Sequence, residues 1–145
     1  MLDRVAIAAR IPHGSGMCLL DQVVAWDGRG VRCTAHSHHD LNNPLRGAGA
    51  GLPIWAGIEY AAQAAAVHGS LLQTQAAPRR GVLAAARDLK AGCERLDEIG
   101  IPLTVTATMR HGDPAGAIYA FEVSAADRPL LSGQLTLMFV AGDSR

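Results

Sequence analysis

The stretch LPIWAGIEYAAQAAAVHG, residues 52–69, contains one formal charge, Glu59, in a run that is otherwise apolar and rich in alanine. Apolar residues recur at helical spacing along one stripe: Ile54, Ile58, Ala61, Ala65 and Leu72. This periodicity predicts a helix from Ile54 to about Gln75, ended by Pro78.

Glu59 is the only Asp, Glu, Lys or Arg between Gly47 and Pro78. An exposed helix face usually carries several charges, so the isolated carboxylate indicates a largely buried helix. Burying a carboxylate is costly unless it is paired, hydrogen-bonded or protonated. We therefore predict that Glu59 acts as a general acid or base, and the alternative is a surface position on a partly exposed helix.

The segments around this helix are typical of strands. A short helix over residues 3–9, with Asp3 as its cap, precedes them. Alternating or β-branched patterns predict five strands over residues 17–26, 31–37, 103–110, 117–125 and 130–142. Residues 80–92 contain helix-favouring alanines, but their flanking turns favour a further strand. One long helix with an antiparallel sheet is an α+β architecture, predicted here as a single domain over residues 1–145.

The composition excludes several classes of protein. Of 145 residues, 49% are hydrophobic and 18% charged, and the formal net charge is zero, which is typical of a compact domain and not of a general nucleic-acid binder. No apolar run is long enough for a signal peptide or a membrane span, so we expect a cytoplasmic protein. Three widely spaced cysteines indicate neither a disulfide framework nor a metal site.

Residues 38–53 form a long loop rich in Gly, Asn and Pro, and such loops are often functional. Its histidines, His38 and His39, are followed by Asp40, which could orient His39. Together with His36 they crowd one segment, but no second ligand group has metal-site spacing, so we predict no metal. His39 can be catalytic, or the pair can be ordinary loop residues.

Three segments resemble the hot-dog fold 3-hydroxyacyl-carrier-protein dehydratases, and among them the dehydratase-like proteins of aryl-polyene clusters. They are IPHGSGMCLLDQVV (11–24), NPLRGAGAGLP (43–53) and WAGIEYAAQAAAVHG (55–69). The resemblance implies a long central helix wrapped by a curved antiparallel sheet, and a dimer or a multiple of a dimer. Apolar strands 103–110 and 130–140, with more hydrophobic face than one helix can cover, favour the same assembly.

The resemblance also implies roles for individual residues. Glu59 stands where the family has its helix carboxylate, and Pro53 where it has the proline that opens the helix. The family's catalytic histidine lies about 14 residues before the carboxylate, where this chain has Leu45. A longer loop would let His39 reach the site; alternatively Asn43 or Asn42 takes that place and dehydration is weakened.

Further residues at the helix start are predicted to bind substrate. Backbone N–H groups in the Leu52–Pro53–Ile54 turn are suited to polarise a thioester carbonyl, as in an oxyanion hole. Gly57 would allow close backbone approach, or else serve packing. Gln63, four residues after Glu59, shares its face and can hydrogen-bond the carboxylate or a water.

The favoured function is dehydration of a 3-hydroxyacyl thioester on an acyl carrier protein or coenzyme A, without a cofactor. His39 would remove the α-proton and Glu59 would protonate the leaving hydroxyl. One alternative is thioester hydrolysis, which needs the helix carboxylate but no loop histidine. The other is a degenerate dehydratase-like subunit that supports an active homologue.

Overall fold

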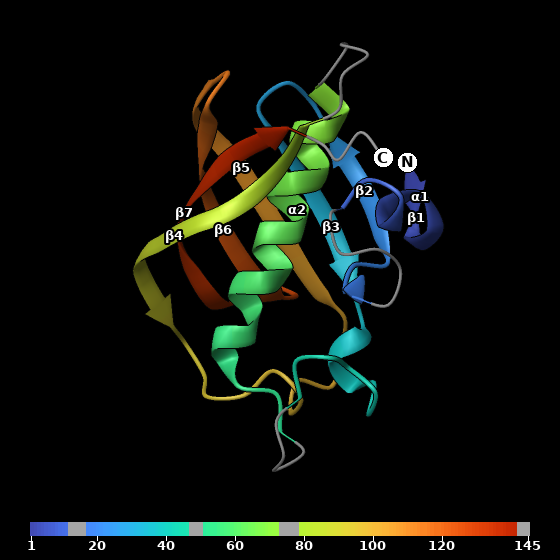
Figure 1. Cartoon of the computed structure of the whole chain (residues 1–145). Coiled ribbons are helices and arrows are strands. Elements are labelled where there is room, and N and C mark those ends of the chain that lie inside the picture. The colour runs from blue at the N-terminus through green and yellow to red at the C-terminus, as the bar shows by residue number, and fades with distance from the viewer. Residues whose placement is uncertain (12–16, 47–50, 73–78, 142–145) are drawn as a thin grey trace.

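The protein is described by a computed structural model covering residues 1–11, 17–46, 51–72 and 79–141 (Figure 1). Its elements in chain order are β1 (Leu2–Asp3), α1 (Arg4–Ala8), β2 (Gln22–Trp26), β3 (Gly30–Ala35), the 3₁₀ turns η2 (Ser37–His39) and η3 (Ile54–Ala56), α2 (Gly57–Leu72), β4 (Arg79–Ala91), β5 (Leu103–Asp113), β6 (Gly116–Ala125) and β7 (Arg128–Ala141).

The strands form a seven-stranded sheet in the order β1-β2-β3-β5-β6-β7-β4, and every neighbouring pair is antiparallel. The sheet curves around α2, which lies across its concave face (Figure 1). This arrangement confirms the expected α+β hot-dog architecture, in which one helix is wrapped by one antiparallel sheet.

Small side chains allow α2 to lie close to the sheet. Ala61, Ala64 and Ala65 are completely buried, and they face a core of aliphatic side chains from the strands. At Gly57 an added Cβ would lie 2.9 Å from Leu131 Cδ2, closer than the core allows. Gly57 thus packs closely against β7 where the helix starts, and its role in substrate binding stays a prediction.

Most sequence-predicted elements are confirmed, with shifted ends. Asp3 caps α1 by accepting a hydrogen bond from the Ala6 amide at 3.0 Å. The ambiguous segment over residues 80–92 is a strand, β4, because it pairs along most of its length with β7. The strand predicted over residues 17–26 was wrong at its start, since β2 begins only at Gln22.

The helix prediction was also wrong in one detail. The chain turns through η3 from Ile54 to Ala56, and α2 itself starts at Gly57. The predicted end near Gln75, Pro78 and the glycines Gly47 and Gly49 lie outside the described residues. No helix in the described part of the chain combines the length and apolar character needed to cross a membrane.

Candidate active site

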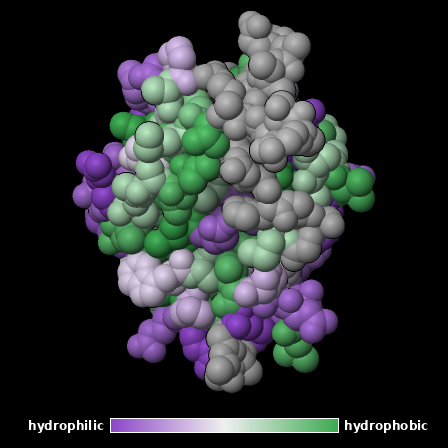
Figure 2. All heavy atoms as spheres, in the orientation of Figure 1, coloured by the Kyte–Doolittle hydropathy of each residue, from purple (hydrophilic) through white to green (hydrophobic). Residues whose placement is uncertain are grey.

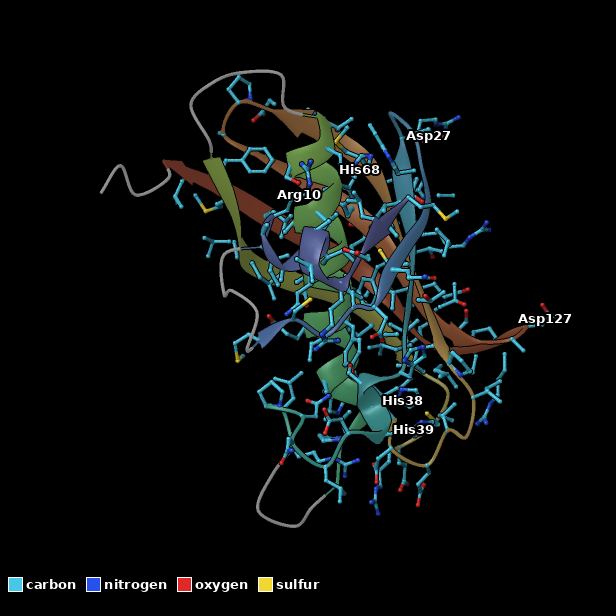
Figure 3. The ribbon with its side chains drawn as sticks, turned by 90° about the vertical axis from the view of Figure 1, so that its right-hand side faces the viewer. Arg10, Asp27, His38, His39, His68 and Asp127 are labelled. Carbon is cyan, nitrogen blue, oxygen red and sulfur yellow. The ribbon has the colours of Figure 1, made fainter. Side chains whose placement is uncertain are left out.

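The start of α2 carries the isolated carboxylate. Glu59 lies in the first turn of α2 and is half-buried, whereas Tyr60 and Ala61, which follow it, are completely buried. His38 and His39 lie at this end of the helix, and His68 and Asp27 lie at the other (Figure 3).

The backbone amides that we expected to polarise a thioester are already bonded. Leu52 N–H donates to Asp97 Oδ1 at 2.9 Å, and Ile54 N–H donates to the Glu94 carbonyl at 2.9 Å. Pro53 has no N–H. The predicted oxyanion role of Ile54 was therefore wrong, because a neighbouring segment of the chain occupies its donor. The next amide, that of Trp55, lies in the first turn, where a helix offers no acceptor of its own.

His39 is exposed, and its position is set by a backbone carbonyl. Its Nε2 forms a short hydrogen bond with the Ile99 carbonyl oxygen. A carbonyl can only accept, so in the neutral ring Nε2 carries the proton and Nδ1 holds the lone pair. Asp40 was expected to orient His39; instead its Oδ1 accepts the Asn42 amide at 2.9 Å within the loop. The basic nitrogen of His39 is thus Nδ1.

His38 lies beneath His39 and is completely buried. The two ring centroids are 3.9 Å apart and the planes are tilted by 37°. His38 Nε2 lies 3.1 Å from the Ile99 oxygen and 3.0 Å from the Ile101 oxygen, while its buried Nδ1 has no hydrogen-bond partner in the part of the chain that the structure describes. Burial lowers the pKa of His38, so its ring is neutral at physiological pH.

Asn43 is buried inside a polar network. Its Nδ2 donates to the Ser37 carbonyl at 2.9 Å and to the Tyr60 hydroxyl at 3.0 Å, and its Oδ1 accepts the Leu45 amide at 2.8 Å. Ser37 Oγ donates to the Leu19 carbonyl at 2.7 Å, so the Tyr60 hydroxyl donates to Ser37. The network fixes the loop on α2, and a catalytic role for Asn43 stays a prediction.

Gln63 forms hydrogen bonds with a third segment of the chain, residues 17–19. It is buried, its Oε1 accepts the Leu19 amide at 2.9 Å, and its Nε2 donates to the Met17 carbonyl at 2.7 Å. These bonds fix residues 17–19 beside the helix and explain why β2 starts later than predicted. The predicted contact of Gln63 with Glu59 or a water stays a prediction.

Sequence reasoning missed Tyr60, Ser37 and the Arg95–Asp97 pair as parts of this region. Tyr60 directly follows Glu59, and a tyrosine among alanines in a buried helix is a signal that its hydroxyl needs a partner. Nothing in the local sequence indicates that Asp97 reaches Leu52, since the two lie 45 positions apart.

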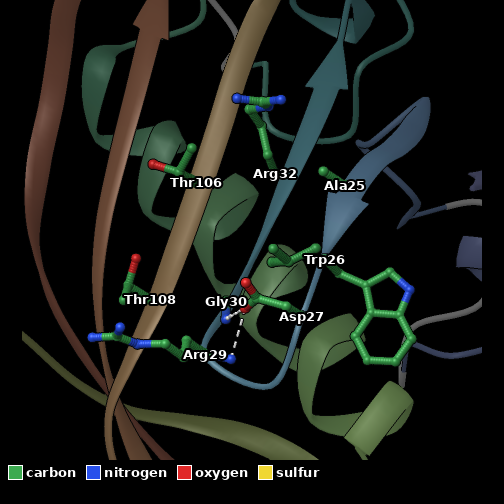
Figure 4. A pocket seen from close by; sticks show the side chains of 9 residues that line it. Ala25, Trp26, Asp27, Arg29, Gly30, Arg32, Thr106 and Thr108 are labelled. Atoms are coloured by element: carbon green, nitrogen blue, oxygen red, sulfur yellow. Dashed lines mark hydrogen bonds between the residues drawn. The ribbon is translucent and has the colours of Figure 1, made fainter.

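A shallow hollow of about 350 Å³ lies away from the candidate site, at the β2–β3 hairpin (Figure 4). Asp27 closes the hairpin by accepting the amides of Arg29 and Gly30 at 2.8 and 3.1 Å, as its Asp-Gly sequence predicts. Arg32, Thr106 and Thr108 line the hollow, and it contains none of the predicted site residues.

The sequence matches the ApeP-like family, described as ApeP dehydratase, over residues 5–143. The chain belongs to the ApeP-like dehydratase family. The resemblance in the helix and its preceding loop is thereby confirmed, and the chain is a hot-dog dehydratase of the aryl-polyene type. No curated protein matches the sequence.

Solved structures agree with the fold of this ApeP-like chain. A chain of the dehydratase heterocomplex ApeI:P from Xenorhabdus doucetiae is 22% identical with a TM-score of 0.79, covering 95% of this chain and 91% of that one. A mutant thioesterase from Pseudomonas aeruginosa is 14% identical with a TM-score of 0.69, covering 98% and 96%. A thioesterase from Haemophilus influenzae is 11% identical with a TM-score of 0.67, covering 97% and 92%.

Proposed function

We propose that this ApeP-like protein dehydrates 3-hydroxyacyl thioesters, carried by an acyl carrier protein, to trans-2-enoyl thioesters in the cytoplasm. One observation carries the proposal: a half-buried carboxylate, Glu59, lies at the start of the central helix in a dehydratase family. The family assignment favours this reaction over thioester hydrolysis.

In the proposed reaction His39 Nδ1 removes the proton from the carbon next to the thioester carbonyl. The electron pair of that C–H bond forms the new double bond, and the bond from the β-carbon to its hydroxyl breaks. Protonated Glu59 gives its proton to the departing hydroxyl, which leaves as water. The Trp55 amide is the proposed donor to the thioester oxygen while it carries negative charge. Proton return from His39 to Glu59 restores the starting state.

We further propose a dimer, or a multiple of one, built along β4. Among the described residues β4 is the last strand of the sheet, so one edge of its 13 residues is open to a second chain. Hydrophobic side chains also gather on the face around α2 and β4 (Figure 2). A symmetric dimer would cover this surface and bring the loop of one chain near Glu59 of the other.

A second candidate function is that of a subunit that works only with a partner dehydratase. Leu45 occupies the position where the related dehydratases have a histidine, and it packs against the core. The similar structure from Xenorhabdus doucetiae is a dehydratase heterocomplex. A partner chain would then supply the base, and this chain Glu59.

One assay separates these functions. The purified protein is incubated with a 3-hydroxyacyl N-acetylcysteamine thioester, and both the enoyl product and free thiol are followed. The proposed function predicts enoyl product without thiol release, and Glu59→Gln abolishes it. Thiol release would identify a thioesterase, and turnover that requires a second dehydratase chain would identify the supporting subunit.

A further inference from the structure

The connection between β4 and β5, residues 92–102, contacts both halves of the candidate site. Residues 94–97 run antiparallel to residues 52–54, with an isolated bridge between Pro53 and Arg95. Leu96 N–H donates to the Leu52 carbonyl at 2.8 Å. Further along, the Ile99 carbonyl accepts from both loop histidines. One short connection therefore fixes the start of α2 and the position of His39.

Asp97 is the side chain at the centre of this connection, and it is only 10% exposed. Its Oδ1 accepts the Leu52 amide at 2.9 Å and Arg95 Nε at 3.0 Å, and its Oδ2 pairs with Arg95 Nη2. The Arg95 hydrogen bonds hold the pKa of Asp97 well below its usual range, so the carboxylate is ionised at any working pH.

Arg95 is in turn confined by the backbone before the helix. A Cβ added at Gly51 would lie 3.2 Å from Arg95 Nη2, so the guanidinium lies directly against that glycine. A two-point pairing between guanidinium and carboxylate is geometrically specific as well as strong. The Arg95–Asp97 pair thus fixes the direction in which residues 51–54 enter α2.

We propose that Asp97 is a positioning residue of the dehydratase, which sets the place of Glu59 relative to His39. The inference rests on the proposed function, because it assumes that these two groups act on one substrate. Asp97 acts through the Leu52 amide on the helix side, and through Leu96 and Ile99, which are joined by a hydrogen bond of 3.0 Å, on the histidine side.

The test compares Asp97→Ala, Asp97→Asn and Glu98→Gln in the full-length protein with a 3-hydroxyacyl N-acetylcysteamine thioester. Glu98 is a matched control, since it lies next to Asp97 and 3.8 Å from Arg95 but is 66% exposed. A misplacement of about 1 Å can cost about a hundredfold in rate. We expect Asp97→Ala to lower kcat about 10- to 100-fold with KM changed less than about threefold, and Glu98→Gln to change kcat less than about twofold.

Asp97→Asn keeps an oxygen for the Leu52 amide but loses the charged pair, so we expect kcat to fall about three- to tenfold. A merely structural role would lower the melting temperature but leave kcat per folded molecule unchanged. Faster hydrogen exchange at the Leu52 and Ile54 amides, with the Gln63-bound Leu19 amide unchanged, would support the proposed route.

A folded Asp97→Ala protein with kcat within twofold of the natural protein would overturn the inference. If Asp97→Ala does not fold, a folded Asp97→Asn protein with kcat within twofold of the natural protein would overturn the inference instead. Glu59→Gln separates the two claims: full activity in that variant defeats the proposed function, whereas an inactive Glu59→Gln with unaffected Asp97 variants defeats only the inference.

Discussion

A buried histidine lies near each end of α2, His68 within the helix and His38 in η2, but the two differ in their hydrogen bonds. At the C-terminal end, His68 Nε2 donates to the Asp27 carbonyl at 2.8 Å, and Nδ1 accepts the Tyr119 hydroxyl at 2.7 Å. At the N-terminal end, His38 Nδ1 finds no partner within the described ranges, the exposed His39 lies against its ring, and Glu59 is half-buried.

Buried polar groups are normally hydrogen-bonded. The complete bonding of His68 therefore indicates a structural role, whereas the incomplete bonding of His38 indicates a region where chemistry takes place. The His68 end is a closed network that joins the helix to β6 and to the β2–β3 hairpin. At the other end, the buried Nδ1 of His38 has no hydrogen-bond partner among the described residues, and the exposed His39 lies against its ring. We expect the functional end of the helix to be this one, at which the buried Nδ1 of His38 lacks a partner in the part of the chain that the structure describes.

The largest expected effect is on activity. Glu59→Gln removes the ionisable proton while keeping the shape, and we expect turnover to fall about two to four orders of magnitude. The melting temperature should stay the same or rise, because a partly buried carboxylate is costly. At the other end, His68→Asn should change kcat less than about threefold. If Glu59→Gln and His68→Asn lowered kcat per folded protein equally, the two ends of the helix would not differ in function.

The second effect concerns which chain of a dimer supplies His39 to the site that contains Glu59. If His39 of one chain serves Glu59 of another, inactive His39→Ala and Glu59→Gln chains should complement each other on mixing. Half of the randomly formed dimers are mixed and each has one intact site of two, so about a quarter of the activity returns.

The control is His36→Ala, an exposed histidine on the same segment, which should remain active. No recovery on mixing would place both groups in one chain. Full activity of His39→Ala would instead favour a base from a partner dehydratase.

The third effect is on stability, and here we expect the larger loss for substitution at the His68 end of the helix. His68→Ala leaves the buried Tyr119 hydroxyl without its His68 partner, removes the bond to the carbonyl of the exposed Asp27 and empties a buried site, and we expect a loss of about 2–4 kcal/mol. His38→Ala breaks the His38 Nε2 bonds to the Ile99 and Ile101 carbonyls, but it also removes a buried nitrogen without a partner among the described residues, and the Ile99 carbonyl keeps its bond to His39. Its loss should therefore be about 1 kcal/mol smaller. Denaturant unfolding measures both, and a larger loss for His38→Ala would contradict the comparison.

The smallest effect is the response to pH. Burial lowers the pKa of His68 and of His38, so between each lowered value and about 6.5 the unfolded chain binds more protons than the folded one. Stability should therefore fall as the pH drops below about 6.5, by at most about 1.4 kcal/mol per histidine at pH 5.5. Between pH 7.5 and 5.5 the melting temperature of His68→Asn should depend less on pH than that of the natural protein. An equal pH dependence in the two proteins would show that His68 does not contribute.

The sequence alone predicted the helix and the strand with strong hydrophobic periodicity, and it singled out Glu59 as a charge in an unusual setting. Helical spacing from Ile54 and the alternation in residues 103–110 predicted α2 and β5, because burial of one face requires that pattern. Glu59 stood out for a physical reason as well, since a single charge in an apolar helix has few purely structural uses. The family assignment confirmed the interpretation of the helix motif.

Only the tertiary structure decided which polar groups meet. Gln63 bonds residues 17–19, Asn43 bonds Tyr60, and Asp97 bonds the Leu52 amide, all across many positions of the chain. Local sequence could not predict that the Ile54 amide is occupied, because its acceptor comes from the β4–β5 connection. Helix and strand periodicity arise from burial of side chains near in sequence, whereas hydrogen-bond partners depend on which distant backbone segments the folded sheet brings together.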